Sequence, residues 1–489
     1  MQSEFLKRKL GAFSNDKSGS VILFFALAAI GMFLIVGLAL DYSRALTAKG
    51  VLNTATDAAA LAALSSMRTD YANNVDSTTM VNNAAAAAQR AFVANAGNDY
   101  AMLNAPPTIN VARTGQVVNA TVSYQARSPN VFAALANVAN MNISHSGAAS
   151  MTMPSYLDFY LLLDVSESMG IPSTASEIDR LAAINPDYLN LYPGGCTISC
   201  HFTAYKACQN AAGQTVYCQG FNLTRTAGNS SNTPVNTVAP YYCTSPGTNA
   251  CIQLRLDAVA YATQLLVQTA INDETNDNLP NQFRIGLYPF VRWMQPLQAL
   301  TTDLATVKTS AATLTNWIDN GYGQSTQSYD SSGNLLSHGT GSGGTHFENA
   351  LPAVNSLITT VGDGSSTSST KPFVFLVTDG AQDNQYQQNN GSWTGSNHAT
   401  TLDTSNCTTI KNRGVTLAVL YVPYVPIPNP TTIWNDEDGY ANNNIPNIPP
   451  ALQSCASPGF FFTASSPTDI NNAMIAMFNM AVQKARLTQ

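Results

Sequence analysis

A long apolar segment near the N-terminus is the first feature of the hydrophobic pattern. Residues 21–40 read VILFFALAAIGMFLIVGLAL and contain no charged side chain. Twenty helical residues at about 1.5 Å each cross a hydrocarbon layer of about 30 Å, so the pattern predicts a single membrane-spanning helix. More basic residues precede the span than follow it, which predicts that residues 1–20 lie in the cytoplasm. Those before it are Lys7, Arg8, Lys9 and Lys17, and those after it are Arg44 and Lys49.

A cleaved signal peptide is the alternative interpretation of this segment. Gly37 and Ala39 are small residues of the kind found before a cleavage site. The apolar run is longer than the roughly 7 to 15 residues of a signal-peptide core, and a helical pattern continues beyond it. An uncleaved anchor is therefore favoured, and the chain after residue 40 is expected on the outer side of the membrane.

The pattern after the span changes twice before residue 154. Residues 41–100 are rich in alanine at helical spacing, with a second helix expected over residues 79–96, and predict a helical stalk. Residues 101–153 combine short alternating stretches, typical of strands, with a helical piece near residues 131–138. They predict a small α+β module between the stalk and the rest of the chain.

From residue 154 to residue 489, short apolar runs alternate with amphipathic helical segments. The runs are uninterrupted rather than alternating, which indicates strands that are buried on both faces. We therefore expect an α/β domain with a doubly wound, mostly parallel sheet covered by helices on each side. The predicted strands lie at LDFYLLL before Asp164, FRIGLY near residue 283, FVFLVT at 373, VTLAVLYV at 415 and FFFT at 460.

Oxygen-bearing side chains gather at the predicted ends of these elements. Asp164 ends the first strand, and Ser166 and Ser168 follow it at alternate positions. Thr345 opens a helix after a glycine-rich run, and Asp379 ends the strand FVFLVT. Ligands of open α/β sheets bind beyond the carboxyl ends of the strands, and hydroxyls and carboxylates are the oxygen ligands that Mg2+ prefers. The spacing predicts a divalent-cation site with room for one further oxygen ligand.

The cysteines indicate an oxidising compartment. Six of the eight fall in one loop-rich stretch, which predicts a disulfide-rich insertion over about residues 171–250. A zinc site is the alternative, but the spacing lacks paired C-x2-C motifs, so disulfides are favoured. The insertion either covers the cation site or frames it. The candidates for disulfide bonds are Cys196, Cys200, Cys208, Cys218, Cys243, Cys251, Cys407 and Cys455.

Charge and histidine content argue against nucleic-acid binding and catalysis. Asp, Glu, Lys and Arg make up 10% of the residues and the net charge is -7, so no basic field is available to bind phosphates. None of the five histidines stands in H-E-x-x-H, and no G-x-S-x-G follows a strand. His346, beside Thr345, is interpreted as a surface residue at a helix start. We expect a protein that is not an enzyme.

The motif D-x-S-x-S, a later threonine and a later T-D-G resemble the metal-ion-dependent adhesion site of von Willebrand factor A domains. The resemblance implies hydroxyl ligands from Ser166, Ser168 and Thr345, with Asp164 and Asp379 binding directly or through water. Thr340 is the alternative if Thr345 is misplaced. The cofactor it implies is Mg2+, with Mn2+ or Ca2+ as substitutes, and the implied partner contributes an acidic side chain.

The N-terminal segment from Gly19 to Leu64, with an apolar span ending before Asp41-Tyr42 and the run TDAAALA at residues 56–62, resembles TadG-like proteins of the tight-adherence (Tad/Flp) pilus system. Cys407 and Cys455 near the end of the A domain also fit that family, and we expect them to be joined. The resemblance implies pilus assembly, with other Tad pilus or envelope proteins as partners and a single-pass location in the bacterial inner membrane with the bulk of the chain in the periplasm. The alternative is a surface-exposed or secreted A-domain adhesin that binds an external ligand.

Overall fold

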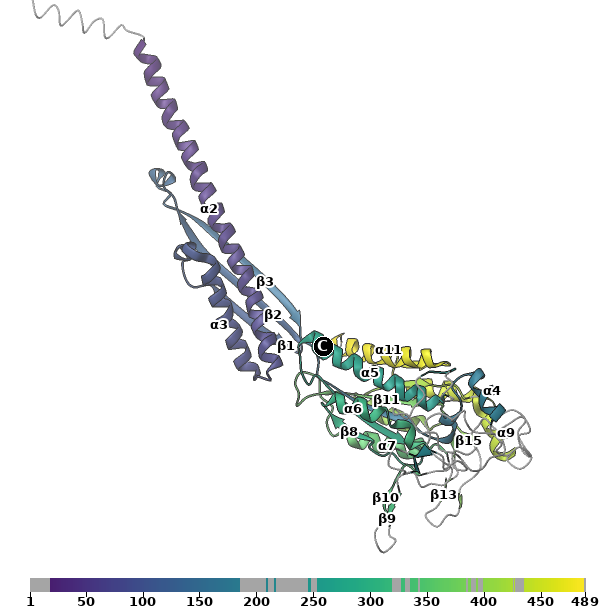
Figure 1. Cartoon of the computed structure of the whole chain (residues 1–489). Coiled ribbons are helices and arrows are strands. Elements are labelled where there is room, and N and C mark those ends of the chain that lie inside the picture. The colour runs from purple at the N-terminus through teal and green to yellow at the C-terminus, as the bar shows by residue number, and fades with distance from the viewer. Residues whose placement is uncertain are drawn as a thin grey trace, which may run out of the picture. The chain divides into compact units, whose positions relative to one another are not determined.

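The computed structural model of the chain divides into two compact units, Met1–Met153 and Pro154–Gln489. Helices and strands keep the labels of Figure 1. The residues that the structure describes are 18–184, 208–209, 215–216, 245–247, 253–318, 327–329, 335–341, 344–383, 386–387, 393–394, 399–424, 426 and 435–487.

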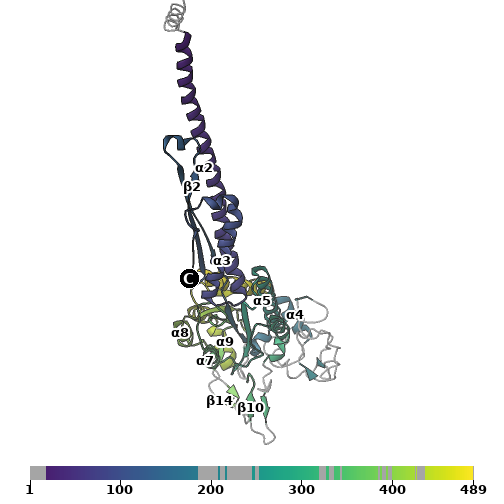
Figure 2. The same cartoon turned by 90° about the vertical axis from the view of Figure 1, so that its left-hand side faces the viewer.

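The first unit is built on one long helix, α2 (Ser18–Ala72), which contains the whole apolar span and most of the predicted stalk (Figure 2). By length and composition it is able to cross a membrane. A second helix, α3 (Ser77–Ala96), is capped by the preceding residue Asp76, whose side chain accepts a hydrogen bond from the backbone N–H of Thr79 at 3.0 Å. Both helices bury stripes of mostly small residues, which let backbones approach closely: Ala45, Ala48, Leu52, Ala55 and Ala59 on α2, and Met80, Ala84, Ala88, Phe92 and Ala96 on α3.

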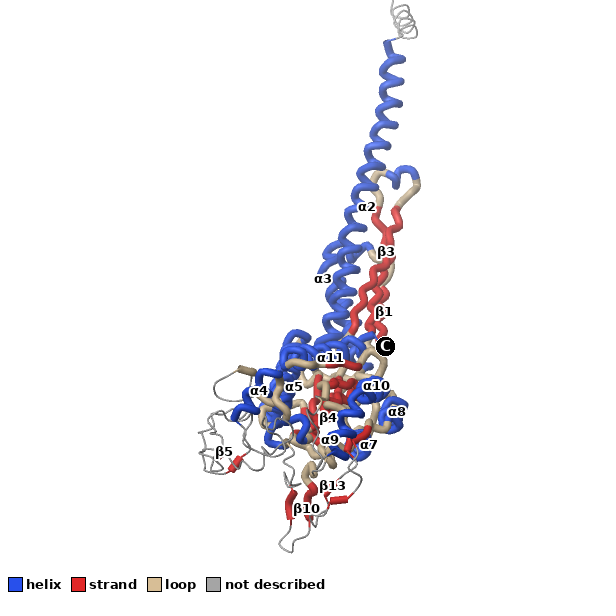
Figure 3. Tube along the Cα trace, turned by 90° about the vertical axis from the view of Figure 1, so that its right-hand side faces the viewer, coloured by secondary structure: helices blue, strands red, loops and turns tan. Residues whose placement is uncertain are grey.

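A three-stranded antiparallel sheet completes the first unit (Figure 3). Its strands follow one another in chain order as β1 (Thr108–Thr114), β2 (Val117–Pro129) and β3 (Asn140–Thr152). Alternate side chains of β2 are buried, from Val118 to Ala126, as expected for a sheet with one covered face. The buried Tyr124 donates a hydrogen bond of 2.8 Å to the side chain of Asn53, so the covered face lies on α2.

The β2–β3 connection is held against α2 by Asp41. The two carboxylate oxygens of Asp41 accept hydrogen bonds of 2.8 to 2.9 Å from the backbone N–H groups of Val131, Phe132 and Ala133. The helical piece expected at residues 131–138 is a single 3-10 turn, Ala133–Ala136. The acid that follows the apolar span therefore caps a turn about ninety positions away in sequence.

The second unit contains a six-stranded sheet in the order β17-β16-β11-β4-β7-β8. All neighbouring strands are parallel except β7 and β8, which are antiparallel. The five predicted strands are confirmed, and the short edge strand β8 was not predicted from the sequence. The bounds are β4 (Leu157–Asp164), β7 (Phe283–Phe290), β8 (Gln298–Thr301), β11 (Lys371–Thr378), β16 (Thr416–Tyr421) and β17 (Phe461–Thr463).

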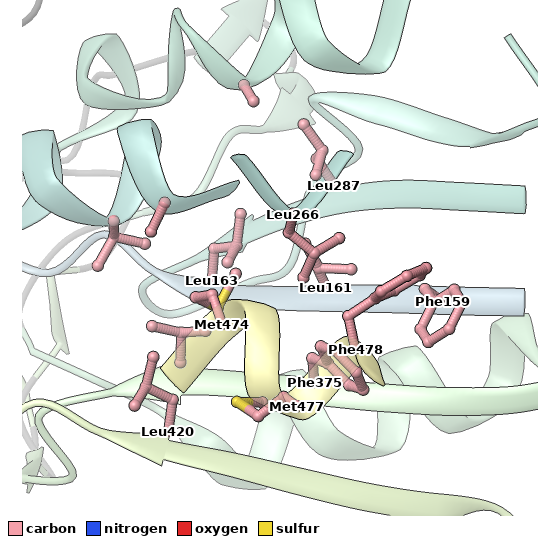
Figure 4. Close-up of a cluster of buried hydrophobic side chains, with 14 of the residues drawn as sticks. Phe159, Leu161, Leu163, Leu266, Leu287, Phe375, Leu420, Met474, Met477 and Phe478 are labelled. Atoms are coloured by element: carbon pink, nitrogen blue, oxygen red, sulfur yellow. The ribbon is translucent and has the colours of Figure 1, made fainter. Parts of the chain in front are cut away.

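Both faces of this sheet are buried, because successive side chains of β4 enter two different cores. Phe159, Leu161 and Leu163 face one core, where Phe159 lies within 5.1 to 6.0 Å of four other phenylalanine rings (Figure 4). Tyr160 and Leu162 face the other core. Full burial on two faces accounts for the uninterrupted apolar run in the sequence. The predicted fold class, a doubly wound α/β sheet, is confirmed.

Each core is closed by its own set of helices. The last helix begins with a side-chain cap: the Ser466 hydroxyl accepts a hydrogen bond from the backbone N–H of Asp469 at 3.1 Å and donates one to its carboxylate at 2.8 Å. The helices of the Phe159 core are α5 (Arg255–Asp277), α6 (Leu304–Ala311) and α11 (Pro467–Leu487), and those of the opposite core are α7 (Phe347–Leu357), α8 (Thr404–Asn412) and α10 (Ile448–Cys455).

The remaining helices and strands of the second unit are short. The helices are α4 (Ala175–Ile184) and α9 (Asn435–Asn444). The strands lie in the two-stranded pairs β5 (Cys208–Gln209) with β6 (Thr215–Val216), β9 (Gln327–Tyr329) with β10 (Leu335–His338), β12 (Gln382–Asp383) with β15 (Ala399–Thr400), and β13 (Tyr386–Gln387) with β14 (Trp393–Thr394).

A disulfide joins two helices on the same side of the sheet. Cys407 of α8 and Cys455 of α10 are bonded, as expected, and both are fully buried. The pairing of the other six cysteines falls outside the described residues. The bond closes a loop of 48 residues, which restricts the unfolded chain.

Replacing Asp41 with alanine should loosen the β2–β3 connection. The three backbone N–H groups would lose a charged acceptor, and each such bond contributes about 1.5–3 kcal/mol. We expect the amides of residues 131–133 to exchange with deuterium about tenfold faster or more, measured by mass spectrometry on the full chain in detergent. In the control variant Asp70→Ala, which loses the bond from the Asn83 side chain, their exchange should be unchanged. Equal exchange in both variants would contradict the role given to Asp41.

Removing the disulfide should destabilise the second unit. The double variant Cys407→Ala/Cys455→Ala should lose up to about 4 kcal/mol of unfolding free energy under oxidising conditions, by the loop-entropy relation. Denaturant unfolding, followed by fluorescence, measures this difference. Under reducing conditions the variant and the unaltered chain should converge, and a difference that persists there would assign the loss to packing of the two side chains instead.

Candidate functional site

The candidate site lies where the chain changes direction across the sheet. From β4 the chain passes to β7 on one side, and later returns to β11 on the other side of β4. This is the switch point at which open α/β sheets bind ligands. Leu163 of β4 pairs with Val377 of β11, so Asp164, the last residue of β4, and Asp379, the first residue after β11, lie at the carboxyl ends of adjacent parallel strands. Two of the predicted site residues are thereby brought to one edge.

The turn after β4 brings both serines to the same edge. The backbone N–H of Ser166 donates a hydrogen bond of 3.0 Å to Asp164 Oδ1, which folds the chain back over the strand end. A 3-10 turn, Glu167–Gly170, follows. The hydroxyl oxygens of Ser166 and Ser168 lie 3.1 Å apart. The expectation that alternate residues point the same way is consistent with this distance.

Thr378 orients Asp164 and was not assigned a role from the sequence. Its hydroxyl donates a hydrogen bond of 2.6 Å to Asp164 Oδ2 and accepts one of 2.9 Å from the backbone N–H of Gly380. Gly380 has a φ of 80°, a conformation that glycine adopts without strain. The motif T-D-G was visible in the sequence. Only the pairing of β4 with β11 shows that its threonine binds the acid of the other strand.

Asp379 is buried, and its charge is compensated only in part. Its side chain is inaccessible to solvent, and neither carboxylate oxygen has a hydrogen-bond partner among the described residues. Burial raises the pKa of Asp379, while the nearby Ser168 hydroxyl and the Arg255 guanidinium oppose that shift. An uncompensated buried carboxylate costs free energy unless a cation or donor satisfies it.

Arg255, at the start of α5, is a second charged group that the sequence did not point to. It is buried, its Nη1 has no hydrogen-bond partner among the described residues, and no hydrogen bond joins it to Asp379. Burial lowers the pKa of Arg255, and the negative charge of Asp379 opposes this. The guanidinium therefore offsets part of the charge of Asp379 and leaves its oxygens available.

Asp164 and Asp379 act on each other. Burial, followed by the charge of Asp379, raises the pKa of Asp164. The hydrogen bonds from Thr378 and Ser166 work in the opposite direction, because they favour the ionised carboxylate. Two buried acids that repel each other form a place where a cation would relieve both desolvation and repulsion.

Thr345 reaches this edge through backbone contacts. Its carbonyl accepts a hydrogen bond of 3.1 Å from Asp383, four residues after Asp379. The next residue, His346, donates its N–H to the carbonyl of Val291, directly after β7, at 2.9 Å. Gly344 allows the close approach, because a Cβ there would lie 2.2 Å from that of Asp383. Thr345 thus lies between the ends of β7 and β11.

Thr340, the alternative to Thr345, also lies beside the end of β7. Its carbonyl accepts hydrogen bonds of 2.8 and 2.9 Å from the N–H groups of Arg292 and Trp293. Both threonines are buried. The choice between them as ligand stays a prediction.

The interpretation of His346 as a surface residue is wrong. The residue is 2% exposed, and its Nδ1 lies 2.6 Å from Glu348 Oε1. Its backbone bond to Val291 places it against the end of β7, where the packing encloses the ring. A position at a helix start does not reveal such a long-range contact.

The donor set is composed of hydroxyls and two carboxylates. No group of three or more His, Cys, Asp and Glu side chains suited to a metal occurs in the part of the chain that the structure describes. Oxygen donors of this kind suit hard cations such as Mg2+ rather than the thiolate and imidazole ligands of zinc sites. The unsatisfied oxygens of Asp379 are where such a cation would fit.

Comparison with known proteins finds one family model. Residues 19–96 match the family described as "Putative Flp pilus-assembly TadE/G-like". No curated protein matches the chain. The matched residues comprise the apolar span, the remainder of α2 and α3.

Several solved structures resemble the chain at low identity. Pilus adhesin SpaC from Lactobacillus rhamnosus GG has 12% identity and a TM-score of 0.34, with coverage of 77% of this chain and 34% of that one. The von Willebrand factor domain of the type V pili tip protein Mfa5 from Porphyromonas gingivalis has 12% identity, a TM-score of 0.31, and coverage of 68% and 96%. Proximal thread matrix protein 1 from the mussel byssus, with a zinc-occupied MIDAS motif, has 11% identity, a TM-score of 0.28, and coverage of 67% and 46%.

This chain spans about a third of the length of SpaC. At these TM-scores the likenesses carry no argument about function, and the fold class rests on the strand order and the two cores described above. The family match is specific to the N-terminal segment. The predicted resemblance to TadG-like proteins is thereby confirmed where it was found: residues 19–96 are similar to the TadE/G-like Flp pilus-assembly family, and they include the one candidate membrane span of the described residues.

Proposed function

We propose that the second unit binds a partner protein through a divalent cation held by Asp164, Ser166, Ser168, Thr345 and Asp379. The observation that carries this proposal is the buried carboxylate of Asp379, whose oxygens have no hydrogen-bond partner among the described residues. It lies one residue beyond the sheet edge that also carries Asp164. A cation would satisfy those oxygens and offset the repulsion between the two acids.

The donor set favours binding over catalysis. Hydroxyl ligands are neutral, so two carboxylates at most balance the charge of a divalent ion, and a cation with a free coordination position attracts another oxygen. An acidic side chain on the partner supplies that oxygen most readily. Mg2+ is the cation proposed, with Mn2+ or Ca2+ as substitutes.

The membrane anchor determines where this binding takes place. The apolar span of α2 is preceded by more basic residues than follow it, which supports a cytoplasmic N-terminus. The buried disulfide of the second unit supports an oxidising compartment. We place the chain in the bacterial inner membrane with its bulk in the periplasm.

Together with the family match of residues 19–96, these features support a role in assembly of a Tad pilus. The second unit would tether another pilus or envelope protein to the inner membrane through the cation. The strength of the tether would then depend on divalent cation and on an acidic residue of the partner.

Addition of Mg2+ should stabilise the second unit in the full chain. At a cation concentration a hundred times the dissociation constant, binding contributes about 2.7 kcal/mol, which appears as a rise in melting temperature. Asp379→Asn and Asp164→Asn should abolish this rise. Differential scanning fluorimetry in detergent, with EDTA as reference, measures it.

Asp158→Asn is the matched control. Asp158 is also a buried acid of β4, but it lies at the opposite end of the strand and binds Arg284 through two hydrogen bonds of 2.6 and 2.7 Å. Its replacement should lower the melting temperature while the rise with Mg2+ persists. The proposed site would be wrong if the rise in melting temperature with Mg2+ were retained in Asp379→Asn and Asp164→Asn. It would also be wrong if the rise were lost in Asp158→Asn as well.

Thr378→Val should weaken cation binding without removing a ligand. The hydroxyl that orients Asp164 would be lost, and the loss of such supporting groups lowers metal affinity about 10- to 100-fold. Thr378→Ser keeps the hydroxyl and should bind as the unaltered chain does. Isothermal titration with Mn2+ compares the three proteins, and equal affinities would show that Thr378 does not position the acid.

A further inference from the structure

The turn at the end of the β2–β3 hairpin exposes a cluster of large apolar side chains. We call residues 131–138 the hairpin tip. Val131, Leu135 and Val138 are 58%, 78% and 52% exposed, and Phe132 is 36% exposed. Elsewhere in the described chain outside α2, exposed large hydrophobic residues stand singly: Val93, Leu357 and Tyr440. Such a cluster indicates a surface that contacts another apolar phase.

The hairpin tip is fixed to α2 at the level of residues 37–41. A Cβ at Gly37 would lie 2.4 Å from the ring of Phe132, so the absence of a side chain there lets the ring rest on the helix backbone. One turn further along the same face, Asp41 accepts the N–H groups of Val131, Phe132 and Ala133. These two contacts prevent the tip from moving away from the helix without breaking the cap.

The contact of Phe132 with Gly37 lies within the apolar span, close to its end. Gly37 precedes Leu40, the last residue of the span, by three positions, which corresponds to about 4.5 Å along the helix. Side chains of interfacial segments enter a bilayer to a depth of about 5–10 Å. If α2 crosses a membrane with residues 21–40 in the hydrocarbon, Phe132 lies at the edge of that layer.

We propose that the hairpin tip inserts into the same membrane that α2 spans, in the leaflet facing the rest of the chain. We expect lipid rather than a second protein to contact the tip, because the apolar surface of the tip is continuous with the exposed apolar surface of the span. No Asp, Glu, Lys or Arg stands between residues 128 and 157, so nothing charged must be desolvated. The polar residues Asn130, Asn137 and Asn140 suit the headgroup region.

Insertion would give the first unit two attachments to the bilayer. One helix alone is free to rotate about its axis and to tilt, whereas a helix with a rigid apolar arm is not. The sheet that follows the tip would then keep a fixed orientation to the membrane surface. This inference depends on the anchor and is independent of the cation site.

The test uses the full chain reconstituted in vesicles of phosphatidylcholine and phosphatidylglycerol. A nitrobenzoxadiazole label is attached at Leu135→Cys in the tip, at Leu38→Cys in the span as a positive control, and at Ser146→Cys as a matched control. Ser146 is exposed and lies on β3, six residues from Asn140, which is about 20 Å along the strand. The unaltered chain, treated in the same way, gives the background from its native cysteines.

Lipids with a doxyl quencher at carbon 5 should quench the labels at residues 38 and 135 at least threefold more than the label at 146. Aqueous iodide should show the reverse order. If the label at 135 is quenched by iodide as strongly as that at 146, the tip lies in water and the proposal is wrong. If neither quencher reaches it, protein covers the tip, and the proposal is equally overturned. A label at residue 38 that lipids do not quench would remove the anchor itself.

Discussion

The second unit depends on the burial of β4 on both faces. Its odd-numbered side chains, such as Phe159, enter one core and its even-numbered ones, such as Tyr160, enter the other. The strand can satisfy its backbone only by pairing with β7 and β11, because helices cover both faces. That pairing also decides where Asp164 ends up, so the packing that stabilises the sheet positions the candidate site.

The buried acids at the two ends of β4 differ in how fully hydrogen bonds and ion pairs satisfy them. At the start of the strand, Asp158 is matched by the guanidinium of Arg284 and the hydroxyl of Thr370. At the end, Asp164 has a hydroxyl and a backbone N–H, and Asp379 beside it has no hydrogen bond within the described chain. Burial of carboxylates with incomplete compensation lowers stability, so folding alone does not favour the second arrangement, and this supports the proposed binding site.

In the first unit, the carboxylate of Asp41 is compensated by hydrogen bonds. Asp41 follows directly on an apolar span, where a free carboxylate would be unfavourable, and three backbone N–H groups satisfy it. The same bonds hold an apolar turn at the height of Gly37. A single acid thus ends the span and fixes the element that we propose to enter the bilayer. Asp41 therefore joins the end of the span to the β2–β3 connection, and the bond from Tyr124 to Asn53 joins the sheet to α2 further along the helix.

Local pattern was sufficient for the main elements of both units. Residues 21–40, the alanine stripes and the five predicted strands follow from hydrophobic periodicity and from apolar runs that are local in sequence. The edge strand β8 was missed because its four residues are only partly buried and form no apolar run. The burial of His346 was missed because it depends on Val291, which is remote in sequence.

The candidate ligands could be named from the sequence because acids and hydroxyls stood at predicted strand ends, and parallel strands bring such ends to one edge. Their partners could not be named. That Thr378 binds Asp164, that Arg255 lies near Asp379, and that Asp41 caps residues 131–133 all depend on contacts between segments far apart in the chain. Periodicity reports which face of an element is buried, whereas the identity of what lies against that face is decided only when the elements pack.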